Sequence, residues 1–390
     1  MAQKKRKICF VITSFIHYSR NMLVLEALGK HPGVDLHICI AGTALLGKYS
    51  AHGAYIRDVL QKSGFSNLYE VHFNLEGGDP VVKAKTAGLG IIELSSLYNQ
   101  IKPDIVVVRG DRFEVLSAAV AASLMNIPIA HIEGGDVTGT IDESIRHAIT
   151  KLAHIHFATN EDARRRIITM GENKKYVFNV GSPDIEVVMR YGKGKPNHAF
   201  IQETGSGADI NTRQPYLIVM YQPVTTELET LRENTRMLLR TVHSLNIPAF
   251  WFWPNFDAGA EEGIAKELRI FSDKVKDHSI KFMRYIPPKE YLSLLNSAVC
   301  LVGNSSAGIK ECSYLGVPVV NIGSRQTNRL KGRHVLDVSH DENAVIHAIQ
   351  KQIAKGRYTP SRIYAKPDTA KNITEILATA PLYVQKQFVA

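Results

Sequence analysis

The sequence has few cysteines and no long apolar run, and each shortage excludes a class of protein. Its 390 residues include four cysteines, widely spaced and without a Cys-x-x-Cys pair: Cys9, Cys39, Cys300 and Cys312. This spacing argues against a zinc site and favours buried, reduced thiols in a cytoplasmic protein. No apolar stretch reaches the roughly 18 residues that identify a transmembrane helix. The apolar part of the N-terminal segment is too short for a signal peptide, so we expect a solvated end before a first strand.

Two binding signatures are missing as well. No Gly-x-Gly-x-x-Gly fingerprint follows the first apolar strand, so no dinucleotide cofactor is expected. The formal net charge is +10, but the basic residues are scattered, with clusters only at residues 4–7 and 164–166. No RNA- or DNA-binding motif accompanies them, which argues against a nucleic-acid partner. An anionic small substrate, such as a phosphate or a nucleotide, explains the positive charge at least as well.

The sequence does contain a repeated alternation of apolar strands and helices. Strands are predicted at residues 7–13, 34–41, 101–109, 127–131, 156–159 and 176–180, and helices at 21–28, 84–100, 115–125 and 161–170. Such alternation predicts the α/β class, with a parallel sheet and helices on both of its faces.

The same pattern restarts after a polar, glycine-rich segment at residues 191–215, where we place a domain joint. Strands follow at residues 216–220, 249–253, 280–285, 298–303 and 317–322, and helices at 227–245, 260–271, 289–296 and 307–314. We therefore expect two Rossmann-like, doubly wound domains, residues 1–190 and 191–368, facing each other across a cleft. Residues 369–390 contain a last helix, which we expect to cross back to the first domain.

The densest group of chemically active side chains lies within residues 129–156. Four acids and four histidines surround a predicted strand end and helix start: Glu133, Asp136, Asp142, Glu143, His131, His147, His154 and His156. Open α/β sheets bind their ligands at such strand ends. His131 and Glu133 stand two apart on a strand and should face one way, where they could share a proton. The alternative is structural: Glu143 completes a capping box with Thr140, and Asp142 is a first-turn acid stabilised by the helix dipole.

A second motif, Arg109-Gly110-Asp111-Arg112, occupies the end of another predicted strand. Glycine there lets a substrate approach the backbone, Asp111 can act as a base or accept from a hydroxyl, and Arg112 can hold a phosphate. The alternative is that Asp111 only caps the helix that follows.

In the second predicted domain, Gly-Asn-Ser-Ser at residues 303–306 lies between an apolar strand and a helix. Backbone amides and the hydroxyls of Ser305 and Ser306 can bind an anion there, and Glu311 can accept from ribose hydroxyls. Arg325, after the next strand, is a second phosphate candidate. The alternative is a serine cap with Glu311 as a first-turn acid. No metal site is expected, because the histidines lack a carboxylate ligand at partner spacing.

With these motifs in view, the chain resembles the hydrolysing UDP-N-acetylglucosamine 2-epimerases of sialic acid biosynthesis. The segments that carry the resemblance run in the family's order and span most of residues 7–378: RGDRFEVLSAAVAASLMNI, HIEGGDVTGTIDESIRHAITKLAH, QPVTTE, WPNFDAGAEE, GNSSAGIKE and GVPVVNIGSRQ. The resemblance implies a fold of the glycosyltransferase B type, an active site in the cleft, no cofactor, and a cytoplasmic homodimer or homotetramer.

The resemblance also implies a mechanism. UDP leaves as the C2 proton is removed, giving a 2-acetamidoglucal, and water then adds to release free N-acetylmannosamine. The acid–base candidates carried over are Asp111, Glu133, Asp142, Glu143 and His131. The substrate-binding candidates are Arg112, Arg146, His156, Gln222, Ser305, Ser306, Glu311 and Arg325. Among these, Arg112, both serines and Arg325 would hold the pyrophosphate, because a leaving diphosphate needs fixed donors.

Three places depart from the family's pattern. The loop at residues 14–20 lacks the usual Arg and Asp, and Arg20 is a candidate to replace the lost phosphate contact. Arg109 and Gln222 each stand where the family often has histidine, and glutamine cannot carry a proton at neutral pH. Because the acids are intact, we expect an active enzyme with a shifted substrate, such as UDP-N,N'-diacetylbacillosamine. A glycosyltransferase and a catalytically silent UDP-sugar sensor are the alternatives.

Overall fold

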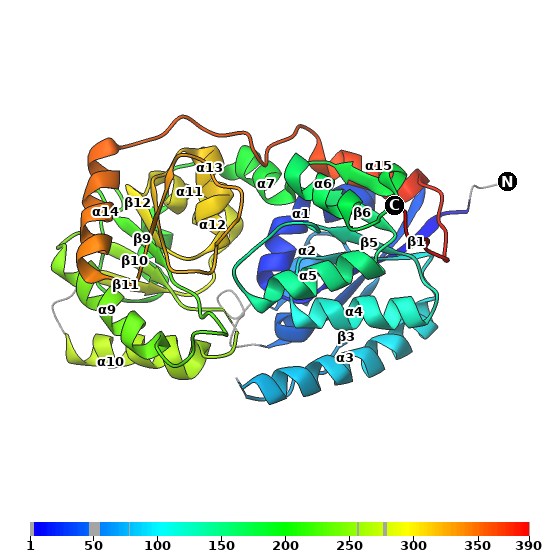
Figure 1. Ribbon diagram of the computed structural model, residues 1–390, viewed down its shortest axis with the longest axis horizontal. Coiled ribbons are helices and arrows are strands. Elements are labelled where there is room, and N and C mark those ends of the chain that lie inside the picture. The colour runs from blue at the N-terminus through cyan, green and yellow to red at the C-terminus, as the bar shows by residue number, and fades with distance from the viewer. Residues whose placement is uncertain (1–3, 47–54, 78, 256, 276–278, 390) are drawn as a thin grey trace. The chain divides into compact units, whose positions relative to one another are not determined.

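The computed structural model describes residues 4–46, 55–77, 79–255, 257–275 and 279–389, and these form two seven-stranded sheets with helices (Figure 1). The predicted α/β class, with two doubly wound sheets, is confirmed. Contacts divide the chain into two compact units. The first unit consists of Met1–Val137, Asp142–Val187 and Tyr364–Ala390, and the second of Thr138–Ile141 and Val188–Ile363. The boundaries predicted from composition are residues 190 and 368.

The sheet of the first unit is entirely parallel. Its strands lie in the order β3 (Leu68–Val71), β2 (Val34–Ala41), β1 (Arg6–Ile12), β4 (Ile105–Arg109), β5 (Ile129–Ile132), β6 (Ile155–Ala158) and β7 (Val177–Asn179). The helical segments are α1 (Phe15–Lys30), η1 (Gly42–Leu45), α2 (Ile56–Lys62), α3 (Pro80–Ile101), α4 (Phe113–Leu124), α5 (Ile141–Leu152), α6 (Glu161–Thr169), η3 (Lys174–Tyr176), α7 (Pro183–Tyr191) and α15 (Thr369–Thr379).

Burial explains why these strands are apolar on both faces. Every residue of β4, with the sequence Ile-Val-Val-Val-Arg, is buried, as expected for a parallel strand covered by helices on both sides. The chain order reverses between the neighbouring strands β1 and β4. Such a reversal opens a crevice at the carboxyl ends of the strands, which is where doubly wound sheets bind ligands.

The sheet of the second unit is parallel except for β8, which pairs antiparallel with β11. Its strands lie in the order β14 (Val335–Val338), β13 (Val319–Ile322), β12 (Cys300–Gly303), β9 (Leu217–Met220), β10 (Ala249–Phe252), β11 (Ile280–Met283) and β8 (Ser206–Gly207). The helical segments are α8 (His198–Glu203), α9 (Leu231–Ser244), η4 (Ala260–Ala265), α10 (Lys266–Lys274), α11 (Pro288–Ser297), α12 (Ser306–Ile309), α13 (Glu311–Leu315) and α14 (Glu342–Lys355). The order reverses here between β9 and β12.

Some predicted boundaries are wrong for identifiable reasons. The strand predicted at residues 101–109 is too long, because α3 continues to Ile101, whose buried side chain fits either pattern. The helix predicted at residues 307–314 is interrupted at Lys310, two residues after Gly308, whose backbone packs closely against Val319. The last predicted helix, residues 369–379, coincides with α15, which packs on α1 of the first unit.

Two further properties concern the molecule's chemistry and environment. All four cysteines are buried and reduced, as predicted, and burial raises the pKa of Cys9 and of Cys300 to about 12. Within the described part of the chain, none of the helices is long and apolar enough to cross a membrane.

Candidate active site

A cluster of polar side chains in the first unit lies at the carboxyl ends of β1, β4 and β5. Gly110 follows β4 with a φ of +77°, and its N–H donates to the carbonyl of Ile132 at the end of β5. A side chain would be strained in this left-handed conformation, so glycine is required for the turn. The turn brings Arg109 and Asp111, on either side of Gly110, to the crevice beside β1.

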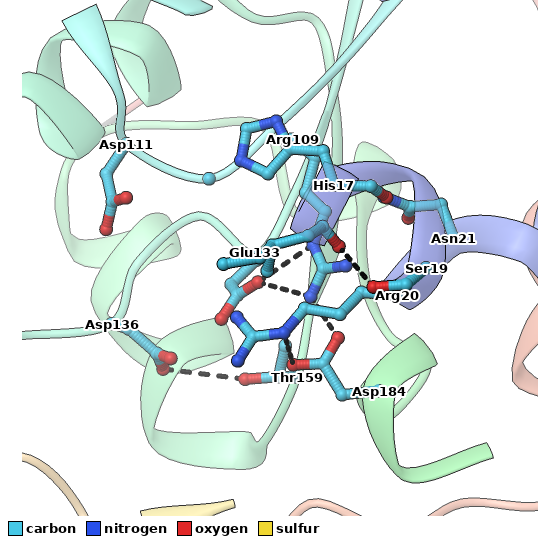
Figure 2. A network of polar contacts seen from close by, with 12 residues as sticks. His17, Ser19, Arg20, Asn21, Arg109, Asp111, Glu133, Asp136, Thr159 and Asp184 are labelled. Atoms are coloured by element: carbon cyan, nitrogen blue, oxygen red, sulfur yellow. Dashed lines mark hydrogen bonds and ion pairs between the residues drawn. The ribbon is translucent and has the colours of Figure 1, made fainter. Parts of the chain in front are cut away.

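Arg109 is the centre of a buried ion network. Its guanidinium donates two hydrogen bonds to Glu133 Oε2, 3.0 Å from Nε and 2.8 Å from Nη2, and a further short one to Asp184. Arg20 reaches the other oxygen of Asp184 from α1, at 3.7 Å (Figure 2). Only 1% of the Arg109 side chain is exposed, so the two carboxylates compensate the charge that burial would otherwise destabilise.

Glu133 has a left-handed backbone conformation, which the sequence pattern did not predict. It follows β5 with a φ of +72°, in the left-handed region that residues other than glycine seldom adopt. Such strain is held in place by surrounding contacts and clusters at functional sites. Here the contacts are the Glu133 N–H, which donates to the Phe157 carbonyl, and the bonds from Arg109 to the carboxylate.

Asp111 and Arg146 form a second pair at the same edge of the sheet. The Arg146 guanidinium, on α5, makes a short contact with Asp111 and also donates to the carbonyl of Asp136 at 2.9 Å. The Asp136 carboxylate in turn accepts from the Asn160 amide at 3.1 Å. Asp111 is the more accessible of the two candidate acids, with 29% of its side chain exposed against 10% for Glu133.

His131 lies beneath this turn and is completely buried. Its Nε2 donates to the Gly110 carbonyl at 2.8 Å, and its Nδ1 is 3.2 Å from the Thr150 hydroxyl. Burial lowers the pKa of His131 to about 3. The expectation that His131 and Glu133 face one way along a strand is wrong, because β5 ends at Ile132 and Glu133 turns into the left-handed region. This arrangement favours a role for His131 in positioning the Gly110 turn.

His17 borders the same site. The segment at residues 14–20 was expected to be a loop, but α1 begins at Phe15, so His17 and Arg20 lie in the first turns of a helix. Its Nδ1 lies 2.9 Å from the Thr13 hydroxyl, and its backbone carbonyl accepts from Asn21. Burial and then the nearby charges of Arg109 and Arg112 hold the pKa of His17 well below its usual range. A neutral His17 therefore sits beside the Arg109–Glu133 pair, where Figure 2 places it.

Several residues predicted for the site have other partners. Arg112 binds the buried Glu114 at 2.9 Å, so its guanidinium already has a counter-ion. Glu143, in the first turn of α5, lies 3.8 Å from His147 and is partly exposed, as is Asp142. His156, on β6, is buried against Glu172 at 3.1 Å.

Glu172 belongs to a separate cluster of the first unit. It accepts from Lys151 at 2.6 Å, from Lys386 at 2.7 Å and from His156. Burial would raise the pKa of Glu172, but these hydrogen bonds outweigh it and hold the pKa at about 2. Among the residues that the structure describes, no group of three or more His, Cys, Asp or Glu side chains is arranged to hold a metal ion.

The second unit has its own polar centre, at the reversal between β9 and β12. Gln222, after β9, is buried, and both of its backbone polar groups pair with the side chain of Asn304, after β12. The Gln222 Oε1 accepts from the backbone N–H of Asn255, after β10, at 2.7 Å. The segment WPNFDAGAEE, which carries part of the family resemblance, includes Phe256, which lies outside the described residues.

The remaining predicted binding residues surround Asn304. Ser305 caps the short helix α12, and Ser306 is its first residue. Arg325, after β13, donates to the Asn304 carbonyl at 3.2 Å. Glu311 begins α13 and is buried. The structure therefore brings Gln222, Ser305 and Arg325 to one edge of the second sheet, through Asn304.

Two important residues were not predicted. Asp184 follows β7 in the run Gly-Ser-Pro-Asp, and its position after a strand was the only signal in the sequence. Asn304 is part of the predicted anion motif, but its side chain bonds to a loop 82 residues away, which no local pattern reveals.

Comparison with known proteins agrees with this arrangement. Residues 26–378 match the family model of UDP-N-acetylglucosamine 2-epimerase. The chain belongs to this family.

Two curated relatives are similar over nearly their whole length. One is the UDP-N-acetylglucosamine 2-epimerase of Neisseria meningitidis, 31% identical over 94% of this chain and 92% of the relative. The other is the UDP-N,N'-diacetylbacillosamine 2-epimerase (hydrolyzing) of Legionella pneumophila, 29% identical over 97% of both chains. The fold also matches that of Methanocaldococcus jannaschii UDP-GlcNAc 2-epimerase, solved with UDP-GlcNAc and UDP, with a TM-score of 0.77 at 18% identity over 95% of this chain and 99% of that one. The glycosyltransferase B type of fold is thereby confirmed.

Proposed function

We propose that this protein is a hydrolysing 2-epimerase, which converts a UDP-2-acetamido sugar to the free 2-epimeric sugar and UDP. The observation that carries the proposal is the pair of carboxylates after β4 and β5, the two strands on one side of the switch point in the first sheet. Asp111 and Glu133 end neighbouring strands, and each is fixed by an arginine, Arg146 and Arg109 respectively. Removing a weakly acidic C2 proton requires carboxylates held in position.

The proposed reaction has two steps. In the first, the C2–H bond and the bond from C1 to the UDP oxygen break, leaving a glycal with a C1–C2 double bond. In the second, water supplies a hydroxyl to C1 and a proton to C2, from the opposite face. Asp111 and Glu133 carry the proton transfers, and water is the only co-reactant.

The second unit supplies the nucleotide site in this proposal. Arg325, the Gln222 amide and the hydroxyls of Ser305 and Ser306 bind the diphosphate, and Glu311 binds the ribose. Fixed donors of this kind stabilise the charge that develops on a leaving diphosphate. Gln222 supplies a hydrogen bond without a transferable proton, so UDP leaves in its anionic form.

The sugar is UDP-N-acetylglucosamine or its diacetamido analogue, UDP-N,N'-diacetylbacillosamine. The two relatives described above are named for these two sugars. The diacetamido sugar is favoured by the altered segment at residues 14–20, because Arg20, on α1, joins the network around Asp184. The free product would be N-acetylmannosamine or its analogue, of the kind used for sialic-type acids.

The test is proton NMR of the purified protein with each UDP-sugar in deuterated water. We expect UDP and the free 2-epimeric sugar, carrying deuterium at C2. A reversible mixture of the two UDP-sugars would contradict the hydrolysing mode. If neither sugar turns over while UDP still binds, the protein is a catalytically silent UDP-sugar sensor. Gln222, which stands where the family often has histidine and cannot carry a proton at neutral pH, is the observation that favours this second candidate.

A further inference from the structure

Asn304 connects loops from four neighbouring strands of the second sheet. Only 1% of the residue is exposed, and its side chain bonds twice to Gln222: Oδ1 accepts from the Gln222 N–H at 2.7 Å, and Nδ2 donates to the Gln222 carbonyl at 2.8 Å. Its backbone carbonyl accepts from Arg325 at 3.2 Å and from the Gln326 amide at 3.0 Å. The loops after β9, β12 and β13 therefore meet at this residue.

The fourth loop is joined through the side chain of Gln222. The backbone N–H of Asn255 can only donate, so the atom that it contacts at 2.7 Å is the amide oxygen of Gln222. The amide nitrogen of Gln222 consequently points away from Asn255. Gln222 is thus held at its backbone by Asn304 and at its side-chain oxygen by Asn255, with its two N–H donors oriented in one direction.

The side chain of Asn304 provides both the acceptor and the donor that the backbone of Gln222 needs. A backbone N–H needs an acceptor and a backbone carbonyl needs a donor, and an amide provides both at once. An ionised carboxylate of the same shape provides acceptors only, so it would face the Gln222 carbonyl oxygen without a proton between them.

We propose that Asn304 is the positioning residue of the diphosphate site, which orients Gln222 through its side chain and Arg325 through its carbonyl. The proposal rests on the function proposed above, because it assumes that these two residues bind the diphosphate. Asn304 touches no reacting atom in this scheme. Its effect on the ligand passes through the two residues that it holds.

The experiment is isothermal titration of UDP into the full-length wild type and the variants Asn304→Asp and Asn304→Ala. At about pH 8, the ionised carboxylate of N304D leaves the Gln222 carbonyl without its donor, and we expect UDP affinity to fall at least about tenfold. At about pH 5, burial and the facing carbonyl favour the protonated acid, whose O–H restores the donor. The affinity of N304D relative to wild type should then recover, whereas that of N304A should not. Comparing each variant with wild type at the same pH removes the titration of UDP itself.

Asn372→Asp, an exposed change of the same charge on α15 of the first unit, is the matched control and should leave UDP affinity unchanged. The proposal is overturned if N304D binds UDP like wild type at about pH 8, or if N304D and N304A stay equally weak at both pH values. If N304D fails to fold by circular dichroism, N304A alone is compared with wild type, and unchanged UDP affinity in that variant also overturns the proposal. A wild-type protein that does not bind UDP would instead contradict the nucleotide site of the proposed function.

Discussion

Asp111 is proposed to act in the reaction, since almost a third of its side chain is exposed, while its partner Arg146 is buried and also binds the Asp136 carbonyl. We expect Asp111→Asn to lower kcat/KM for UDP release by on the order of 10²–10⁴-fold, the usual contribution of an acid–base group. Because the Arg146 side chain is only 1% exposed and loses its carboxylate partner, we also expect the free energy of unfolding to fall by about 1–3 kcal/mol.

Asp162→Asn is the matched control, because Asp162 also pairs with an arginine, Arg165, but on the exposed surface of α6. Its kcat/KM should equal that of the wild type. Wild-type kcat/KM in D111N would remove Asp111 from the acid–base pair.

Arg109 is expected to contribute more to stability than to the reaction, because it is buried between two carboxylates. Arg109→Met keeps the volume but leaves Glu133 and Asp184 without their shared cation, and we expect a loss of about 3–5 kcal/mol in the free energy of unfolding. Urea denaturation measures this loss. Arg57→Met removes a surface pair with Glu70 and should cost about 1 kcal/mol or less. Equal losses in the two variants would show that the buried network contributes no special stability.

At the scale of the elements, Glu172 joins α5, β6 and the C-terminal segment. Its carboxylate binds Lys151 of α5, His156 of β6 and Lys386 near the chain end. Its pKa of about 2 lies below the ordinary 4.5, so the stability from this cluster is complete above about pH 4.5 and is lost as the pH falls toward 2.

We therefore expect Glu172→Gln to lower the free energy of unfolding by on the order of 3 kcal/mol at neutral pH. The difference from wild type should shrink as the pH falls from 4.5 toward 2 in urea titrations. Glu161→Gln, which removes an exposed pair with Arg164, is the control and should have a much smaller effect. A difference that stays constant with pH would contradict the assignment of this stability to the ionised carboxylate.

At the scale of the whole molecule, the C-terminal segment packs against the first unit and forms hydrogen bonds with carbonyl groups at the C-terminal end of α5. Lys386 donates to the carbonyls of Lys151 and Ala153, at 2.6 and 2.5 Å, where α5 has just ended. The Tyr383 hydroxyl donates to the His154 carbonyl, and the His154 ring bonds to the Val384 carbonyl. A cation at a helix C-terminus satisfies carbonyl groups that the helix itself leaves unpaired.

Removal of all residues after Ala380 should therefore destabilise the first unit, which carries Asp111 and Glu133, without weakening the nucleotide site that we propose in the second. We expect a lower Tm and reduced turnover, with UDP affinity within about twofold of wild type. Differential scanning calorimetry and UDP titration on the same sample test this. A loss of UDP affinity as large as the loss of turnover would contradict the separation of the two roles.

Local patterns predicted most of the fold because strands and helices are encoded by short-range periodicity. Buried parallel strands such as β1 and β4 appear as continuous apolar runs, and their ends can be read from the glycine or polar residue that follows. The elements β3, β14 and α2, few of whose residues are buried, were missed, and so were the helices α7 and α14. Asp111, Glu133 and Ser305 were chosen as candidates for the same local reason, because each lies within two residues of a strand end.

The sequence by itself thus determined the α/β class, the strand ends and the carboxylates that stand there. Only the tertiary structure decided which charges meet. Arg109 and Asp184 are 75 residues apart, and Asp111 and Arg146 are 35 apart, so their pairing depends on the order of strands in the sheet. That order follows from how the helices pack and how the chain crosses over, which residue spacing does not record. The structure therefore gave Glu133 a guanidinium partner and His131 a buried place beneath Gly110, where alternation along a strand had predicted a shared proton.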